Sequence, residues 1–203
     1  MPESAAPRRL GILGGSFDPI HIGHLVAAEE ARVALGLATV LFVPTGQPYH
    51  RTESPAAAAD DRFRMTELAI RSNPAFAASR LEIERPGPSY TIDTVRALQA
   101  ERPGAELYLI LGTDAVAQLF TWHEHEALVR ECRFIVVSRP GVSRDEAVAG
   151  GPPGFERRLH YLEIPNLDVS STELRRRLRE GRSVRYLVPA EVEHYIRERG
   201  LYR

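Results

Sequence analysis

The stretch GGSFDPIHIGH, residues 14–24, directly follows a short apolar run, LGIL, at residues 10–13. The two adjacent glycines permit a tight turn and let a ligand approach the backbone closely, because neither carries a side chain. His21 and His24 are three residues apart at the start of a predicted helix, so they project to the same side. The unpaired amides and partial positive charge of a helix N-terminus suit an anion. The pattern predicts a phosphate site in which two imidazoles join the amides of a turn.

The spacing of the glycines differs from that of two common phosphate-binding loops. Gly11, Gly14 and Gly15 give G-x-x-G-G, which is neither the dinucleotide fingerprint nor a P-loop. Ser16 can present its hydroxyl and its amide to a phosphate, whereas we expect Asp18 to fix the turn rather than to react. Zinc binding at the two histidines is disfavoured, because no Asp, Glu or Cys stands nearby at ligand spacing.

Short apolar runs alternate with helix-like patterns along the rest of the chain. Strands are predicted at residues 10–13, 38–43, 81–83, 107–111, 134–137 and 159–164. Helices are predicted at residues 24–35, 61–70, 91–100 and 171–179, with one more opening at Gly112 and a last one after Pro189. This alternation is typical of βαβ units. We therefore predict an α/β, Rossmann-like fold: an open, mostly parallel sheet with helices on both faces.

The length of 203 residues suits a single domain. We expect residues 1–203 to form one domain, with a flexible N-terminus at residues 1–8. Residues 139–154 are rich in Gly and Pro and are predicted to form a surface loop. The sequence leaves open whether this loop acts as a lid.

Composition narrows the classes of function. All 26 basic residues are arginine, so no lysine is available for a P-loop, a Schiff base or a nucleophile. The formal net charge of −1 gives no reason to expect a nucleic acid partner. No apolar run approaches the roughly 20 residues of a membrane span, so no membrane partner is expected. Cys132 is the single cysteine, which excludes an internal disulfide and makes a cytoplasmic location the default expectation.

A second motif, SSTELR, begins at Ser170 near the other end of the chain. Ser170 and Glu173 fit a capping box at the start of a helix. Capping alone leaves Arg175 unexplained, since this arginine lies only one turn inside the same helix. From there it can reach phosphates at the helix N-terminus, while Arg176 and Arg177 point elsewhere and are expected to be solvated. Two hydroxyl groups beside the cap can donate to the same phosphates: Ser171 and Thr172.

Together, the HIGH motif at residues 21–24 and the SSTELR motif resemble the two signatures of the H-x-G-H nucleotidyltransferase superfamily. The resemblance implies an α/β fold, ATP as substrate and adenylyl transfer. It also implies catalytic roles for His21, His24 and Arg175. The residues that it implies for ATP binding are Gly14, Gly15, Ser16, Phe17, Asp114, Ser171 and Thr172.

The middle of the chain resembles one branch of that superfamily, the bacterial nicotinate-nucleotide adenylyltransferases. PSYT at 88–91, TWH at 121–123 and GTD at 112–114 match elements of that branch. QPYHR at 47–51 stands where the branch usually has P-P-H-[KR], and Tyr49 replaces its second proline, which leaves the shape of this loop open. The resemblance implies transfer of the adenylyl group of ATP to nicotinate mononucleotide, giving deamido-NAD and pyrophosphate in NAD biosynthesis.

The acceptor site follows from the chemistry of a pyridine mononucleotide. Its flat ring suits an aromatic face, and its carboxylate needs hydrogen-bond donors. Its phosphate suits a cationic or imidazole side chain. The residues expected to bind it are His50, Arg51, Ser89, Tyr90, Thr91 and Trp122. Other roles stay open for some candidates: core packing for Trp122, a solvated loop for the His50–Arg51 pair, and helix capping for Asp114.

The expected mechanism is a direct in-line displacement, because no Ser or Cys with an adjacent base suggests a covalent intermediate. Mg²⁺ is expected as the cofactor, carried by the substrate phosphates without a protein metal site. Two alternatives remain: preference for nicotinamide mononucleotide, or for both mononucleotides, and a non-catalytic nucleotide sensor. The sequence also leaves a homo-oligomer open. The remaining histidines are interpreted as surface or structural: His123, His125, His160 and His194.

Overall fold

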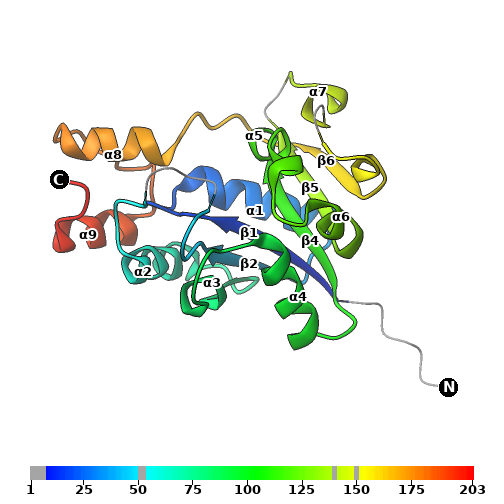
Figure 1. Ribbon diagram of the computed structural model, residues 1–203. Coiled ribbons are helices and arrows are strands. Elements are labelled where there is room, and N and C mark those ends of the chain that lie inside the picture. The colour runs from blue at the N-terminus through cyan, green and yellow to red at the C-terminus, as the bar shows by residue number, and fades with distance from the viewer. Residues whose placement is uncertain (1–7, 50–53, 139–140, 149–150) are drawn as a thin grey trace.

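The computed structural model describes residues 8–49, 54–138, 141–148 and 151–203, and this part of the chain contains one six-stranded sheet (Figure 1). The strand order is β3-β2-β1-β4-β5-β6, and every neighbouring pair runs parallel. The strands are β1 (Arg9–Gly15), β2 (Thr39–Pro44), β3 (Phe76–Ala78), β4 (Glu106–Gly112), β5 (Arg133–Ser138) and β6 (Leu159–Glu163). The predicted α/β class with an open parallel sheet is therefore confirmed.

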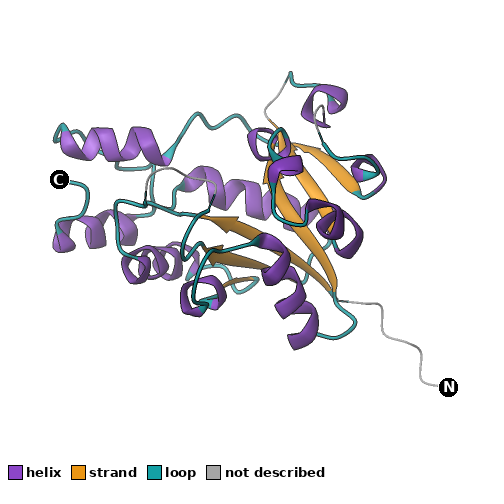
Figure 2. Ribbon diagram, in the orientation of Figure 1, coloured by secondary structure: helices purple, strands orange, loops and turns teal. Residues whose placement is uncertain are grey.

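Helices cover both faces of this sheet (Figure 2). The longer ones are α1 (Ile22–Leu35), α2 (Ala59–Ile70), α4 (Thr91–Glu101), α6 (His125–Glu131), α8 (Ser171–Arg179) and α9 (Ala190–Arg199). The shorter ones are α3 (Leu81–Glu84), α5 (Thr113–Val116), α7 (Arg144–Val148) and the 3-10 turns η1 (Leu119–Thr121) and η2 (Phe155–Arg157). No helix in the described ranges is both long and apolar enough to cross a membrane.

The apolar core lies in two layers, one on each face of the sheet. In β4, Leu107, Leu109 and Leu111 pack with α4, α5 and α6 on one face, whereas Tyr108 and Ile110 pack with α1, α2, α8 and α9 on the other. Successive side chains of a strand point to opposite faces. A strand that is buried on both faces must therefore be apolar at every position, which explains the unbroken LYLIL run.

The strand order reverses between β1 and β4. β1 pairs with β2 on one side and with β4 on the other, so the chain leaves β1 and β4 in opposite directions along the sheet. In open parallel sheets, ligands bind beyond the carboxyl ends of the strands at this kind of reversal. The fold thus places the ends of β1 and β4, Gly15 and Gly112, at the edge where a ligand is expected.

One predicted strand is wrong. Residues 81–83 form the helix α3 instead, and the third strand is Phe76–Ala78, which pairs with β2. The LEI pattern has the alternation of a strand, but the Ser79 hydroxyl accepts a hydrogen bond of 3.2 Å from the amide of Leu81. The amide of Leu81 therefore bonds to a side chain instead of to a neighbouring strand, which favours a turn, and the helix begins there.

The predicted surface loop at 139–154 contains a short helix, α7. Ser143 and Glu146 cap it reciprocally, since the amide of Ser143 donates to the Glu146 carboxylate at 2.8 Å and the amide of Glu146 donates to the Ser143 hydroxyl at 3.2 Å. At the other end of the chain, the predicted flexible segment lies outside the described residues except for Arg8, whose carbonyl accepts from the amide of Glu106.

Candidate active site

The turn after β1 combines an open backbone with a buried aromatic side chain. Gly14 is exposed, and Gly15 and Ser16 are half-buried. Phe17 has a left-handed backbone, with φ of 47°, and its side chain is only 1% exposed. A Cβ atom on Gly15 would lie 3.1 Å from the Phe17 ring, so a larger residue there would crowd the ring. Of the residues expected to bind ATP here, Phe17 can contribute through its main chain only, while its ring belongs to the core.

The two histidines of the turn form a stacked pair. His21 caps α1, and its amide donates to Nδ1 of His24 at 3.2 Å. The imidazole rings lie 3.7 Å apart between centroids, and the His24 and Phe17 rings meet at a right angle, 5.1 Å apart between centroids. Because Nδ1 of His24 accepts a hydrogen bond, its neutral ring carries the proton on Nε2. The prediction that both rings lie on one side of the turn is confirmed.

Burial sets the charge state of this pair. His21 is 6% exposed, and its Nδ1 atom has no hydrogen-bond partner among the described residues. Loss of hydration lowers the pKa of His21 to about 4. The pKa of His24 is also lowered well below its usual value, first by burial and then by the neighbouring His21. Both rings are therefore neutral at pH 7 and offer N–H groups rather than full charges.

Helix α8 brings Arg175 to this turn from the other end of the chain. A guanidinium nitrogen of Arg175, Nη1, donates to the main-chain carbonyl of Asp18 at 2.8 Å. The hydroxyl of Ser171 donates to the carbonyl of Pro19 at 2.9 Å, which fixes the start of the helix against the turn. Thr172 is exposed and accepts from Arg175 at 3.3 Å. The structure thus joins the two motifs, which lie 157 positions apart at this contact.

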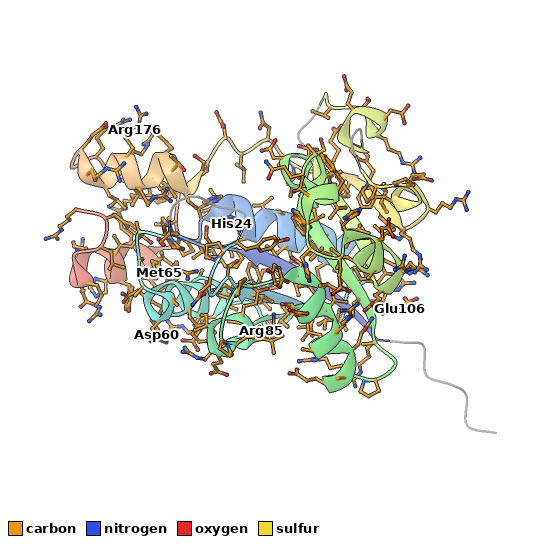
Figure 3. The ribbon with its side chains drawn as sticks, in the orientation of Figure 1. His24, Asp60, Met65, Arg85, Glu106 and Arg176 are labelled. Atoms are coloured by element: carbon orange, nitrogen blue, oxygen red, sulfur yellow. The ribbon has the colours of Figure 1, made fainter. Side chains whose placement is uncertain are left out.

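The cap of α8 agrees with the sequence in part. The Ser170 hydroxyl accepts from the amide of Glu173, as expected. The Glu173 side chain, however, does not complete the box: its carboxylate accepts from Arg176 at 2.8 Å and from Arg177 at 3.1 Å. Arg176 lies on the outer side of α8 and points away from the molecule (Figure 3). The expectation that it is solvated is confirmed, whereas Arg177 is half-buried beside Glu173.

Asp18 holds the turn together, as predicted. It is 2% exposed, and its carboxylate accepts from the amides of Ala56 and Ala57 at 2.7 and 3.0 Å. The hydroxyl of Tyr202 donates to the same carboxylate at 2.8 Å, and Nη1 of Arg175 lies 3.7 Å from it. One buried anion therefore connects the turn, the start of α2, α8 and the C-terminal segment.

Arg62 is a site residue that the sequence analysis missed. It is 1% exposed, and its guanidinium donates to three carbonyls: those of Ser16 at 2.7 Å, Thr45 at 2.7 Å and Ala57 at 3.3 Å. Loss of hydration lowers its pKa. The carbonyls of Ser16 and Thr45 follow β1 and β2, so Arg62 ties together the two loops at the ligand edge. Its spacing of three and seven residues from Met65 and Ala69, on the buried face of α2, was the available signal.

The loop after β2 is also joined to the segment that precedes α4. The amide of Ser89 donates to the carbonyl of Gln47, and the Ser89 hydroxyl accepts from the amides of Gly46 and Gln47 at 3.1 and 3.2 Å. Ser89 is 6% exposed, so its hydroxyl serves the joint between the loops. A Cβ atom on Gly46 would lie 2.1 Å from the carbonyl oxygen of Glu82. Only glycine allows this approach.

An aromatic cluster lies beside this joint. Tyr90 and His123 stack with ring centroids 4.2 Å apart, and Tyr49 meets Tyr90 edge-on at 4.6 Å. The amide of His123 donates to the Tyr49 hydroxyl at 2.9 Å. Tyr49, the departure from the usual proline, therefore supports the loop that carries His123. Trp122 is half-buried and packs against the core layer that includes α4, which favours a packing role for part of its ring.

The remaining predicted residues have these positions. Thr91 is the first residue of α4, and Asp114 is an exposed residue in α5, directly beyond β4 at the ligand edge. His50 and Arg51 lie outside the described residues. His123, interpreted as a surface or structural residue, is half exposed and stacks on Tyr90, a contact that the sequence did not specify. Within the described ranges, no group of three or more His, Cys, Asp or Glu side chains could hold a metal ion.

Comparisons with known proteins find relatives over nearly the whole chain. Residues 12–177 match the family model of cytidylyltransferase-like proteins. A probable nicotinate-nucleotide adenylyltransferase of Moorella thermoacetica is 47% identical over 97% of this chain and 93% of its own length. One from Acidothermus cellulolyticus is 48% identical over 96% of this chain and 94% of its own length.

Solved structures share the fold. The nicotinic acid mononucleotide adenylyltransferase of Plasmodium falciparum, complexed with NaAD, superposes with a TM-score of 0.78 at 22% identity. The superposition covers 96% of this chain and 97% of that one. At this identity the likeness concerns the arrangement of helices and strands.

Proposed function

Because the chain belongs to the nicotinate-nucleotide adenylyltransferase family of cytidylyltransferase-like proteins, we propose that it transfers the adenylyl group of ATP to nicotinate mononucleotide. The products are deamido-NAD, which is nicotinate adenine dinucleotide, and pyrophosphate, and the reaction serves NAD biosynthesis. The observation that carries the proposal is the contact between Arg175 and the carbonyl of Asp18, which brings a guanidinium to the turn that holds His21 and His24.

The reaction needs alignment of two polyanions more than it needs acid or base chemistry. A phosphate oxygen of the mononucleotide attacks the α-phosphorus of ATP, a new P–O bond forms, and the bond to the β-phosphate breaks. The attacking oxygen is already anionic near neutral pH, so no protein base is required. Catalysis of this kind comes from positioning and from stabilising charge on the transferred and departing groups.

The described side chains suit these tasks. We assign His24 to donate a hydrogen bond to the α-phosphate oxygens as their charge grows, and His21 to hold the triphosphate. Arg175 takes charge on the departing pyrophosphate. Neutral imidazoles fit this arrangement, because two charged rings 3.7 Å apart would repel each other before a nucleotide arrived. The open backbone of Gly14 and Gly15 allows the nucleotide to approach the turn.

The acceptor subsite is assigned to the aromatic cluster beside the joined loops. Tyr90 and Trp122 offer faces for the pyridine ring, and Thr91, as the first residue of α4, offers an amide and a hydroxyl near its carboxylate. Asp114 is assigned to the hydroxyls of the ATP ribose. His50 and Arg51 are assigned to the mononucleotide phosphate.

Mg²⁺ fits the reaction as an ion carried by the substrate phosphates. Magnesium prefers oxygen ligands and retains several waters. In the part of the chain that is described, no cluster of His, Cys, Asp and Glu side chains could coordinate it. When bound, it would neutralise phosphate charge. We expect chelation to abolish turnover and added Mg²⁺ to restore it. Full activity with zinc alone would contradict this part of the proposal. A cytoplasmic location, expected from the single cysteine, belongs to the proposal too.

The decisive experiment compares two acceptors. The purified protein, ATP and Mg²⁺ are incubated with nicotinate or nicotinamide mononucleotide, and pyrophosphate release is followed. We expect kcat/KM for the nicotinate form to exceed that for the amide by about 100-fold or more, since the two groups differ in charge and in donors. Equal or reversed values would replace the proposal with a dual-specificity or nicotinamide enzyme. ATP binding without pyrophosphate release from either acceptor would indicate a sensor.

A further inference from the structure

Two tyrosine hydroxyls connect the last helix and the segment after it to the rest of the molecule, and each donates to an aspartate. Tyr195, on α9, donates to Asp61 on α2 at 2.7 Å. Tyr202, beyond the end of α9, donates to Asp18 at 2.8 Å. The two pairs have the same chemistry, but only the second one ends in the turn that binds Arg175. The helices concerned, α2, α8 and α9, lie together on one side of the molecule (Figure 1).

The backbone is arranged to return Tyr202 to the turn. α9 ends at Gly200, which has a left-handed φ of 61°, and the amide of Leu201 donates back to the carbonyl of Ile196. Tyr202 itself has a φ of 64°, an uncommon value for a residue with a side chain. Its ring is 9% exposed and packs in the core layer on the α1 side of the sheet. The hydroxyl is thus held firmly against Asp18.

The Asp18 carboxylate divides its contacts between its two oxygens. Oδ1 accepts from Tyr202 and from the amide of Ala57, while Oδ2 accepts from the amide of Ala56. Arg175 stands 3.7 Å from Oδ2 and makes its short contact, 2.8 Å, with the main-chain carbonyl of Asp18 instead. A carboxylate that is held by three donors has little freedom to turn toward the guanidinium.

We propose that the hydroxyl of Tyr202 is a positioning group for Arg175 and acts through the Asp18 carboxylate. This inference rests on the proposed function. Without the hydroxyl, Oδ1 loses one of its two donors, and the carboxylate can rotate toward the nearest cation. Arg175 is then drawn into a closer ion pair with Asp18 and is withdrawn from the departing pyrophosphate. Tyr202 thereby contributes to phosphate recognition without touching the nucleotide.

Tyr202→Phe tests the proposal, because it removes one oxygen and keeps the buried ring. Tyr195→Phe is the matched control, since it removes the same kind of bond at a distance from the turn. We expect both variants to fold, as followed by circular dichroism, and to lose thermal stability to a similar degree. Only Tyr202→Phe should lower kcat, by about tenfold. Its KM for the mononucleotide should stay within about twofold of the wild type. Assay temperatures are kept well below both melting points.

A double-mutant cycle separates positioning from general loosening of the structure. In an Arg175→Ala background, Tyr202→Phe should cause no further loss of kcat, because the group that it positions is gone. The proposal is wrong if the double variant loses kcat by the product of the two single-variant factors. It is also wrong if Tyr202→Phe and Tyr195→Phe have the same kcat. If the wild-type protein releases no pyrophosphate, the proposed function fails. In that case, the ATP affinity of the four proteins of the cycle is measured by calorimetry. If Tyr202→Phe weakens ATP binding only in the proteins that retain Arg175, the positioning role is supported.

Discussion

The imidazole rings of His21 and His24 stack at 3.7 Å, with only 23° between their planes. His21 donates its amide to Nδ1 of His24, so the backbone at the start of α1 fixes the orientation of the second ring. Figure 3 shows His24 near the middle of the molecule, in the first turn of α1. The backbone fixes the orientation of the pair, and burial keeps both rings uncharged. These two properties can be tested separately.

Replacing His24 tests its role in the transition state. His24→Ala should lower kcat by about 100-fold or more, because a donor aimed at charge that develops during the reaction matters most at the transition state. The KM values should change much less. Steady-state kinetics with both substrates measure the split. His194→Ala, which alters a histidine whose side chain is 58% exposed on α9, should leave kcat unchanged. Near-normal turnover in His24→Ala would remove this residue from the mechanism.

The buried His21 predicts a dependence of stability on pH. Its pKa is about 4 in the folded protein and about 6.5 in the unfolded chain. Between these values the unfolded chain binds more protons, so the stabilising contribution is complete above pH 6.5 and is lost as pH falls toward 4.

Urea unfolding of the wild type and of His21→Gln measures this contribution. From about pH 7 to pH 5, the free energy of unfolding of the wild type should fall by about 2 kcal/mol more than that of the variant. The carboxylates titrate in both proteins, so their effect cancels in the comparison. Parallel pH profiles would show that burial of His21 does not shift its titration.

Arg62 should matter for stability and for the shape of the ligand edge. Arg62→Met leaves the buried carbonyls of Ser16, Thr45 and Ala57 without their donor. We expect a loss of about 3 kcal/mol or more in the free energy of unfolding, measured by chemical denaturation. Arg64→Met is the control on the same helix, because Arg64 is half exposed and pairs with Glu67 on the surface. It should change stability by about 0.5 kcal/mol at most. Equal losses of stability in the two variants would argue against the role of Arg62 in joining the two loops.

The aromatic subsite predicts a selective effect on the acceptor. Trp122→Ala should raise KM for nicotinate mononucleotide by about tenfold, since stacking on an aromatic face contributes to binding of a flat ring. KM for ATP should stay within about twofold. Phe120→Ala is the control, because this neighbouring aromatic residue is 53% exposed. A rise in both KM values, or in neither, would remove Trp122 from the acceptor site.

The fold was largely predictable because its central strands are buried on both faces. A strand such as β4 must be apolar at every position, and such a run stands out in the sequence. The edge strand β3 has only three residues, all half-buried, so it gives no comparable signal. The mistaken strand at 81–83 shows the same limit, since alternation over three residues cannot be told from one turn of helix.

The site was predictable where its chemistry lies in contiguous motifs. His21, His24 and Arg175 each belong to such a motif, and the structure brings them to one turn. Arg62 was missed because its partners are main-chain carbonyls, which leave no trace in a sequence. The stacking of His123 on Tyr90 was missed because 32 residues separate the two along the chain and only the fold joins them.

The position of α8 and α9 after the last described strand, β6, has a consequence for protein synthesis. The ribosome makes the chain from its N-terminus, and domains begin to fold as they emerge. Every strand of the described sheet is complete at Glu163, before Arg175 and Tyr202 have been added. A nascent polypeptide, or one cut short by premature termination, can hold both histidines and still lack the guanidinium. Translation therefore adds Arg175, the group assigned to the departing pyrophosphate, only after every strand of the described sheet has been made.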